Sequence, residues 1–91
     1  MLFGEKILDY WDDILKDLAT VVAIPSVAKA QDGEYPYGKE CARAIDTVVA
    51  LAESYGLKAK NVGYHAAHAE YGEGEGNAVI MAHLDVVPAG E

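Results

Sequence analysis

Apolar residues recur every three or four positions in the first quarter of the chain, with aspartates and lysines between them. The spacing over Ile7–Val22 is typical of one face of an amphipathic helix, so it predicts a helix from about Gly4 to Ala23. Pro25 sets the end of this helix, because the residue before a proline is displaced from helical backbone angles. We therefore expect a loop from Pro25 onward.

A second apolar stripe runs from Cys41 to Tyr55 and predicts a second helix. Gly56 follows it, at the position where helices often end in a glycine. Cys41 belongs to the stripe, so we expect a buried and unreactive thiol rather than a nucleophile. The aromatic residues just before this helix, Tyr35 and Tyr37, are expected to pack over its start; lining a substrate cleft is the alternative.

The period of the apolar residues changes after the second helix, and three segments are typical of strands. They are Leu57–Val62, Tyr64–Tyr71 and Asn77–His83, the last being a continuous apolar run of the kind found in buried strands. The glycine-rich stretch Gly72–Gly76 suits an antiparallel hairpin between the last two. The fold class is therefore α/β: two helices followed by a three-stranded, at least partly antiparallel sheet with an open face or edge.

Two other patterns have plainer explanations than a binding site. The glycine run precedes a strand and contains two glutamates, which favours a turn over a phosphate-binding loop. His65 and His68 would share a face on a helix, but they point to opposite faces of the predicted strand, which argues against a joint metal site. No repeat or linker divides residues 1–91 into two domains.

Composition limits the classes of function. The 91 residues carry a formal net charge of -8, so nucleic acid is not an expected partner. A hydrophobic fraction of 52% indicates a globular chain, yet no apolar run approaches a membrane span. The start of the chain lacks the pattern of a secretory signal, and a single cysteine excludes a disulfide framework. These features favour a cytoplasmic location without a membrane partner.

The strongest chemical signal is His83 followed two residues later by Asp85, at the end of the apolar run. In an extended segment, these two side chains share a face. A neutral imidazole is a common metal ligand, and a nearby carboxylate can accept the hydrogen of its other ring nitrogen and orient it. One histidine and one carboxylate do not complete a zinc site, which needs three or four ligands.

The run ending in His83-Leu84-Asp85-Val86-Val87-Pro88 resembles the first metal-binding motif of the M20 family of metallopeptidases. The similarity extends over nearly the whole chain and is closest to the peptidase V-like branch, the dipeptidases of the Xaa-His or carnosinase type. The other segments that carry the resemblance are Ile24–Val27, Tyr35–Lys39, Lys60–Val62 and Ala69–Gly74.

The resemblance implies the N-terminal part of a three-layer αβα catalytic domain that hydrolyses short peptides with two zinc ions. His83 would match the first metal ligand, and Asp85 would match the catalytic carboxylate that orients it. The remaining ligands and the general base of the family lie beyond the position of Glu91, so we expect an incomplete N-terminal portion that is inactive alone. Two alternatives stay open: part of an M20 deacylase or aminopeptidase, and a small non-catalytic domain that binds a partner or forms homo-oligomers through uncovered apolar surface.

Overall fold

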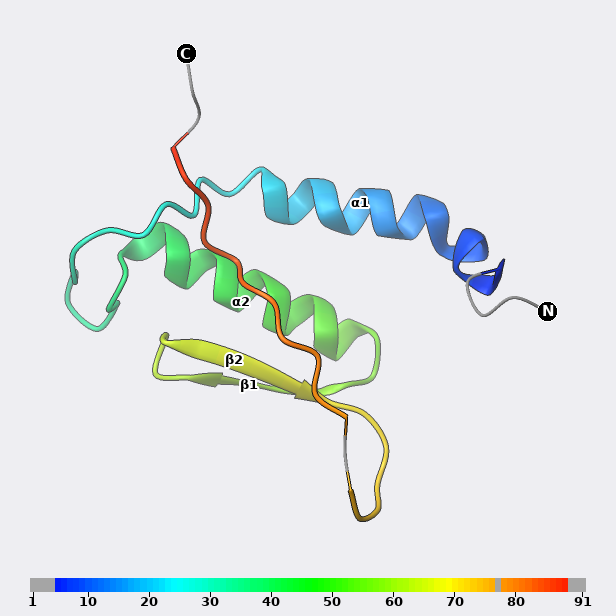
Figure 1. Cartoon of the computed structure of the whole chain (residues 1–91). Helices are drawn as coiled ribbons and strands as arrows, with labels where there is room; N and C mark the ends of the chain where they lie inside the picture. Colours follow the sequence, from blue (N-terminus) through cyan, green and yellow to red (C-terminus); the bar gives the residue numbers. More distant parts are fainter. Residues whose placement is uncertain (1–4, 77, 89–91) are drawn as a thin grey trace.

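The computed structural model describes residues 5–76 and 78–88, so the predicted boundaries at Gly4 and Asn77 lie outside the described residues. A 3-10 helix, η1 (Glu5–Tyr10), leads into α1 (Trp11–Val22), and α2 (Lys39–Ser54) follows after a loop (Figure 1). Two strands complete the element order, β1 (Lys58–Val62) and β2 (Ala66–Glu70). None of the helices in the described ranges has both the length and the apolarity to cross a membrane.

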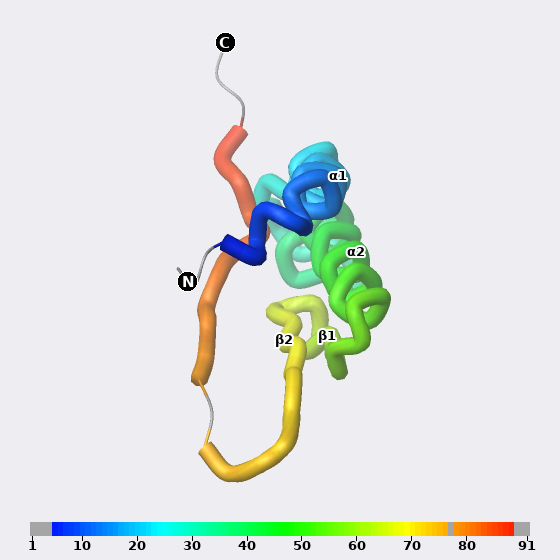
Figure 2. Tube along the Cα trace, turned by 90° about the vertical axis from the view of Figure 1, so that its right-hand side faces the viewer, coloured from blue at the N-terminus to red at the C-terminus, as the bar shows by residue number. Residues whose placement is uncertain are grey.

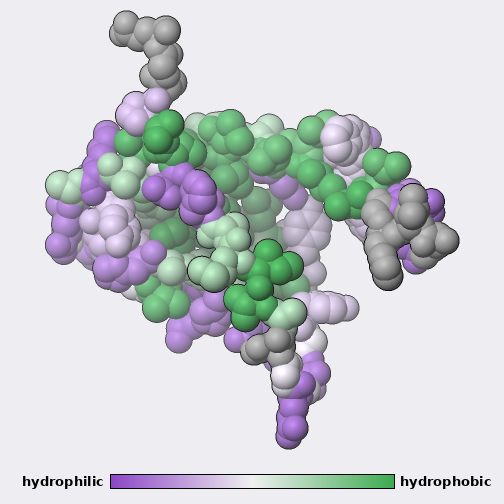
Figure 3. Space-filling view, viewed as in Figure 1, coloured by the Kyte–Doolittle hydropathy of each residue, from purple (hydrophilic) through white to green (hydrophobic). Residues whose placement is uncertain are grey.

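The first predicted helix is confirmed over most of its length. Its first six described residues form a tighter 3-10 helix instead of an α-helix, a common arrangement at helix starts. The α-helical part ends at Val22, with the Ala23 amide still bonded to Ala19 O at 3.0 Å, as the proline two residues later predicts. No residue of α1 is buried, and Figure 3 shows hydrophobic side chains along its surface. The apolar face of α1 is therefore largely uncovered.

The core lies on α2. Its buried residues are Cys41, Ala42, Ala44 and Ile45, and Ile24 from the preceding loop joins them. The predicted burial of Cys41 is thus confirmed, and the predicted stripe is buried in the first half of the helix, whereas Tyr55 at its end is 57% exposed. The Cα radius of gyration is 15.2 Å, whereas a compact chain of this length has roughly 12 Å. The small core and the wide spread of the chain both indicate that much apolar surface lacks a packing partner.

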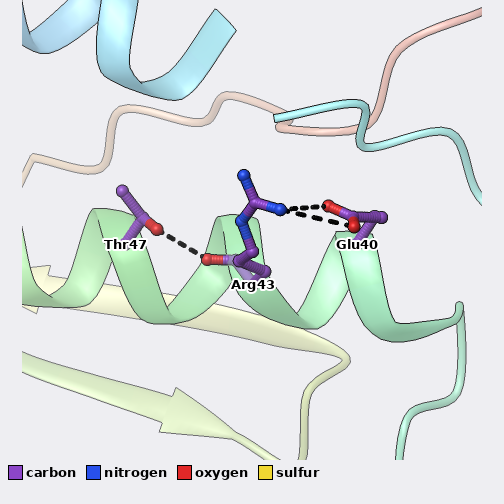
Figure 4. Close-up of polar contacts among 3 residues, drawn as sticks. All are labelled: Glu40, Arg43 and Thr47. Carbon is purple, nitrogen blue, oxygen red and sulfur yellow. Dashed lines mark hydrogen bonds and ion pairs between the residues drawn. The ribbon is translucent and has the colours of Figure 1, made fainter. Parts of the chain in front are cut away.

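The opposite face of α2 is polar. Arg43 Nη1 lies 3.0 Å from Glu40 Oε2, one helical turn earlier, and Thr47 donates from its hydroxyl to Arg43 O at 2.8 Å (Figure 4). Both charged side chains are substantially exposed, so the ion pair adds little stability. The pattern shows which side of α2 faces solvent. The helix follows Gly38, which has a φ of 94°, in the region that favours glycine.

The two strands form an antiparallel hairpin that packs on α2. The register pairs Lys58 with Glu70 and Val62 with Ala66, which leaves a three-residue turn at 63–65. Gly63 and Tyr64 both have positive φ values near 60°, and the Asn61 side-chain oxygen accepts the Tyr64 amide at 2.8 Å. The predicted hairpin across the glycine run is therefore wrong: the described strands pair through this tighter turn instead.

The predicted third strand is also not formed among the described residues. Residues 78–83 carry no strand assignment, and the sheet has two strands. They run past α2 in Figure 1 but stand apart from β2 in Figure 2, and a cleft of about 1420 Å³ lies between them and β2. The run pairs with neither strand in the part of the chain that the structure describes, and Ile80 is 96% exposed. The described residues thus form an α/β unit with two helices and one hairpin.

Candidate functional site

Successive side chains of residues 83–85, in the sequence motif, point to two different sides. Leu84 is half-buried and lines an apolar groove with Val21 of α1 and Val48 of α2. Its neighbours His83 and Asp85 turn the other way, with side chains 85% and 60% exposed. The anchoring of Leu84 against the helices therefore presents His83 and Asp85 together on the open side, lining the cleft that faces β2.

The structure brings the two side chains into contact. His83 Nδ1 lies 3.3 Å from Asp85 Oδ1 and 3.1 Å from the main-chain oxygen of the same aspartate. Both contacts use Nδ1 and both partners are acceptors, so they favour the tautomer with its hydrogen on Nδ1. In that tautomer the lone pair is on Nε2, the atom free to bind a metal. The pair thus has the arrangement of a metal-ligating histidine with its orienting carboxylate.

The described residues do not supply a complete zinc site. Zinc in proteins takes three or four protein ligands. Within residues 5–76 and 78–88, no group of three or more histidine, cysteine, aspartate or glutamate side chains lies close enough to hold a metal ion. The described residues therefore fit one ligand of a metal centre and do not fit a whole one.

The other two histidines line the same cleft from its far wall. His65 lies in the hairpin turn, with its ring 5.8 Å from that of Tyr37, and His68 lies on β2, 3.8 Å from a Glu70 oxygen. The prediction that both histidines lie on one strand is therefore wrong, because the turn begins at residue 63. The Tyr37 ring packs against this turn rather than over the start of α2 alone.

Ser26 is the residue whose role the spacing of the sequence does not reveal. It is 2% exposed and connects three segments. Its hydroxyl donates to Leu84 O at 2.6 Å, and its main-chain oxygen accepts the Val86 amide at 3.0 Å and the Cys41 thiol at 3.4 Å. A serine after a proline reads as a loop residue, and only the fold shows that residues 84–86 cross it.

Cys41 lies next to Ser26. Burial raises the pKa of its thiol, and the negative charge of Asp85 raises that pKa further. Both effects favour the neutral thiol, which is the weak nucleophile. The structure thus gives the physical basis for an unreactive cysteine beside the candidate site.

These shifts predict that the fold loses stability in alkali. The pKa of Cys41 is raised, and so is that of Tyr55, chiefly because its hydroxyl donates to Asp17 of α1. A raised pKa in the folded state stabilises it below the unfolded-state values, about 8.5 for cysteine and 10 for tyrosine, and this gain is lost as pH rises through the folded values. We expect the urea midpoint to be flat from pH 7 to 8 and to fall towards pH 10.5. Tyr55→Phe should remove only the part of this fall that comes from Tyr55, because the pKa values of Tyr35 and Tyr64 are raised as well; a midpoint that is constant to pH 10.5 contradicts the prediction.

Comparison with known proteins shows that this chain is similar to dipeptidases. The chain is 37% identical over 82 aligned positions to the Beta-Ala-Xaa dipeptidase of Lactobacillus delbrueckii subsp. lactis, covering 88% of this chain and 17% of that protein. It is 36% identical over 93 positions to proteins named "Putative dipeptidase" in Staphylococcus aureus strains USA300 and N315, covering 99% of this chain and 20% of theirs. The chain spans about a fifth of the length of these curated relatives. No family model and no solved structure matches it. The predicted resemblance to dipeptidases is confirmed.

Proposed function

Because the similarity to dipeptidases extends over 88% or more of this chain, we propose that it is the N-terminal part of a zinc-dependent dipeptidase of the M20 type. This similarity is the observation that carries the proposal. The contact between His83 and Asp85 at the end of an apolar run supports the assignment of the metal site. A cytoplasmic location belongs to the same proposal and is favoured by the single cysteine.

The geometry supports a role for two residues of this chain. His83 would hold one of two zinc ions through Nε2, while Asp85 would accept the hydrogen on Nδ1, fix the tautomer and raise the basicity of the ring. When bound in such a centre, zinc polarises a substrate carbonyl and lowers the pKa of a water. The cleft beside the pair is where a short peptide would lie.

The remaining ligands come from residues outside the described ranges, because these ranges supply no group of three donors. For the same reason, the 91-residue chain alone is proposed to have no peptidase activity. One histidine with an orienting carboxylate holds zinc too weakly to retain it at micromolar concentration.

A graft tests the proposal. The aligned segment of the Lactobacillus dipeptidase, together with the positions that match His83 and Asp85, is replaced by the sequence of this chain, and hydrolysis of a β-alanyl dipeptide is measured. We expect a folded graft that is active, that loses activity with a chelator and that regains it with zinc. The 91-residue chain assayed alone is the negative control. A folded graft without activity would overturn the proposal and favour the non-catalytic alternative, whereas activity that is insensitive to the chelator would overturn the zinc dependence.

A further inference from the structure

We propose that Ser26 is a positioning residue for the His83–Asp85 pair, an inference that rests on the proposed metal site for its functional meaning. Ser26 contacts the motif segment on both sides of Asp85: its hydroxyl donates to the carbonyl before Asp85, and its own carbonyl accepts the amide after it. Asp85 is therefore held between two hydrogen bonds from a single buried residue.

The arrangement is that of one rung of a parallel strand pair. There, a residue accepts from the amide that follows its neighbour and donates to the carbonyl that precedes it. The Ser26 amide is not available for the second bond, because it donates to Ile24 O at 2.8 Å within the tight turn after α1. The hydroxyl takes its place at 2.6 Å from Leu84 O. A side chain without a hydroxyl at position 26 would lose one of the two hydrogen bonds, the one to Leu84 O.

The consequence for the site follows from the surroundings of the motif. The exposed side chains of His83 and Asp85 are not held by packing. Among the described residues, segment 78–88 makes one backbone hydrogen bond to the rest of the chain, from the Val86 amide to Ser26 O. Ser26 is itself fixed, since it is 2% exposed and its oxygen also accepts from Cys41 of α2. We infer that the backbone angles that set the separation of His83 and Asp85 are held by Ser26, which is itself bonded to Cys41 of α2.

The first test uses the 91-residue chain without metal, so it does not depend on the proposed function. Amide hydrogen exchange at Val86 and the side-chain χ1 couplings of His83 and Asp85 are measured by NMR in the native chain, Ser26→Ala and Ser26→Thr. We expect Ser26→Ala to lower Val86 protection about tenfold and to average the couplings of both residues, because about 1.4 kcal/mol of hydrogen bonding corresponds to a factor of ten. Ser26→Thr keeps the hydroxyl and should restore both.

The second test measures the effect in the active graft. Ser26→Ala should lower kcat about tenfold with little change in KM, and alter the visible spectrum of the cobalt-substituted enzyme. Unchanged Val86 exchange and couplings would overturn the positioning role even if the graft is active, whereas an inactive native graft would overturn only the proposed function. If Ser26→Ala does not fold, Ser26→Cys, which keeps a similar volume with a weak donor, should give intermediate exchange; native exchange in that variant would contradict the proposal.

Discussion

In the active graft, His83→Ala is expected to lower kcat/KM at least about a thousandfold. The substitution removes the ring whose Nε2 is left free by the Nδ1 contacts to Asp85. A metal ion contributes several kcal/mol of charge stabilisation to the transition state, and about 4 kcal/mol corresponds to a factor of a thousand. The measurement is steady-state hydrolysis of a β-alanyl dipeptide, with bound zinc counted by atomic absorption. The expected zinc content falls together with activity.

Two variants separate the metal role from general damage to the cleft. His68→Ala removes another histidine that lines the same cleft but lies on β2, and it should leave the zinc content unchanged. Asp85→Asn keeps the shape of the side chain but weakens its acceptor, so it should cost about ten- to a hundredfold in kcat/KM. Equal losses of zinc in the His68 and His83 variants would show that the cleft is generally disturbed and would refute the assignment of His83.

The helices could be predicted from sequence because each carries its own signal. The hairpin packs on α2 and the first half of the apolar stripe of α2 is buried, so the helical period and the burial coincide there. The apolar residues of α1 show the same period, yet none is buried. Periodicity predicts which face of a helix is apolar; whether that face is covered depends on the rest of the fold.

The strands were less predictable, since a strand is defined by its partner. Residues 78–83 have the apolar character of a buried strand, but pairing needs a free backbone edge at hydrogen-bonding distance. The turn at Gly63 and Tyr64 carries a weaker signal than the glycine run, because its stability depends on a positive φ at a tyrosine and on an Asn61 side chain. Local composition therefore misplaced the hairpin, while the antiparallel pairing itself was predicted.

One part of the candidate site could be predicted from the sequence and another could not. Spacing alone places His83 and Asp85 on one face, and in the structure His83 Nδ1 lies 3.3 Å from Asp85 Oδ1. Ser26 lies 58 positions from Leu84, and nothing in the spacing connects them. Contacts between distant segments decide how firmly a motif is held, and such contacts are visible only once the chain is folded.

The same small core makes Ile45→Ala the most damaging substitution for the fold itself. Ile45 is 7% exposed and belongs to a set of five buried apolar residues, so truncation leaves a cavity that few neighbours can fill. We expect the free energy of unfolding to fall by about 2–5 kcal/mol, out of a total of about 5–14 kcal/mol for a domain of this length. Urea titration followed by circular dichroism measures the loss. The matched control is Ile80→Ala, the same chemical change at a side chain that is 96% exposed, which should alter stability by less than about 0.5 kcal/mol. Equal losses at the two positions would mean that the core on α2 does not determine the stability of the chain.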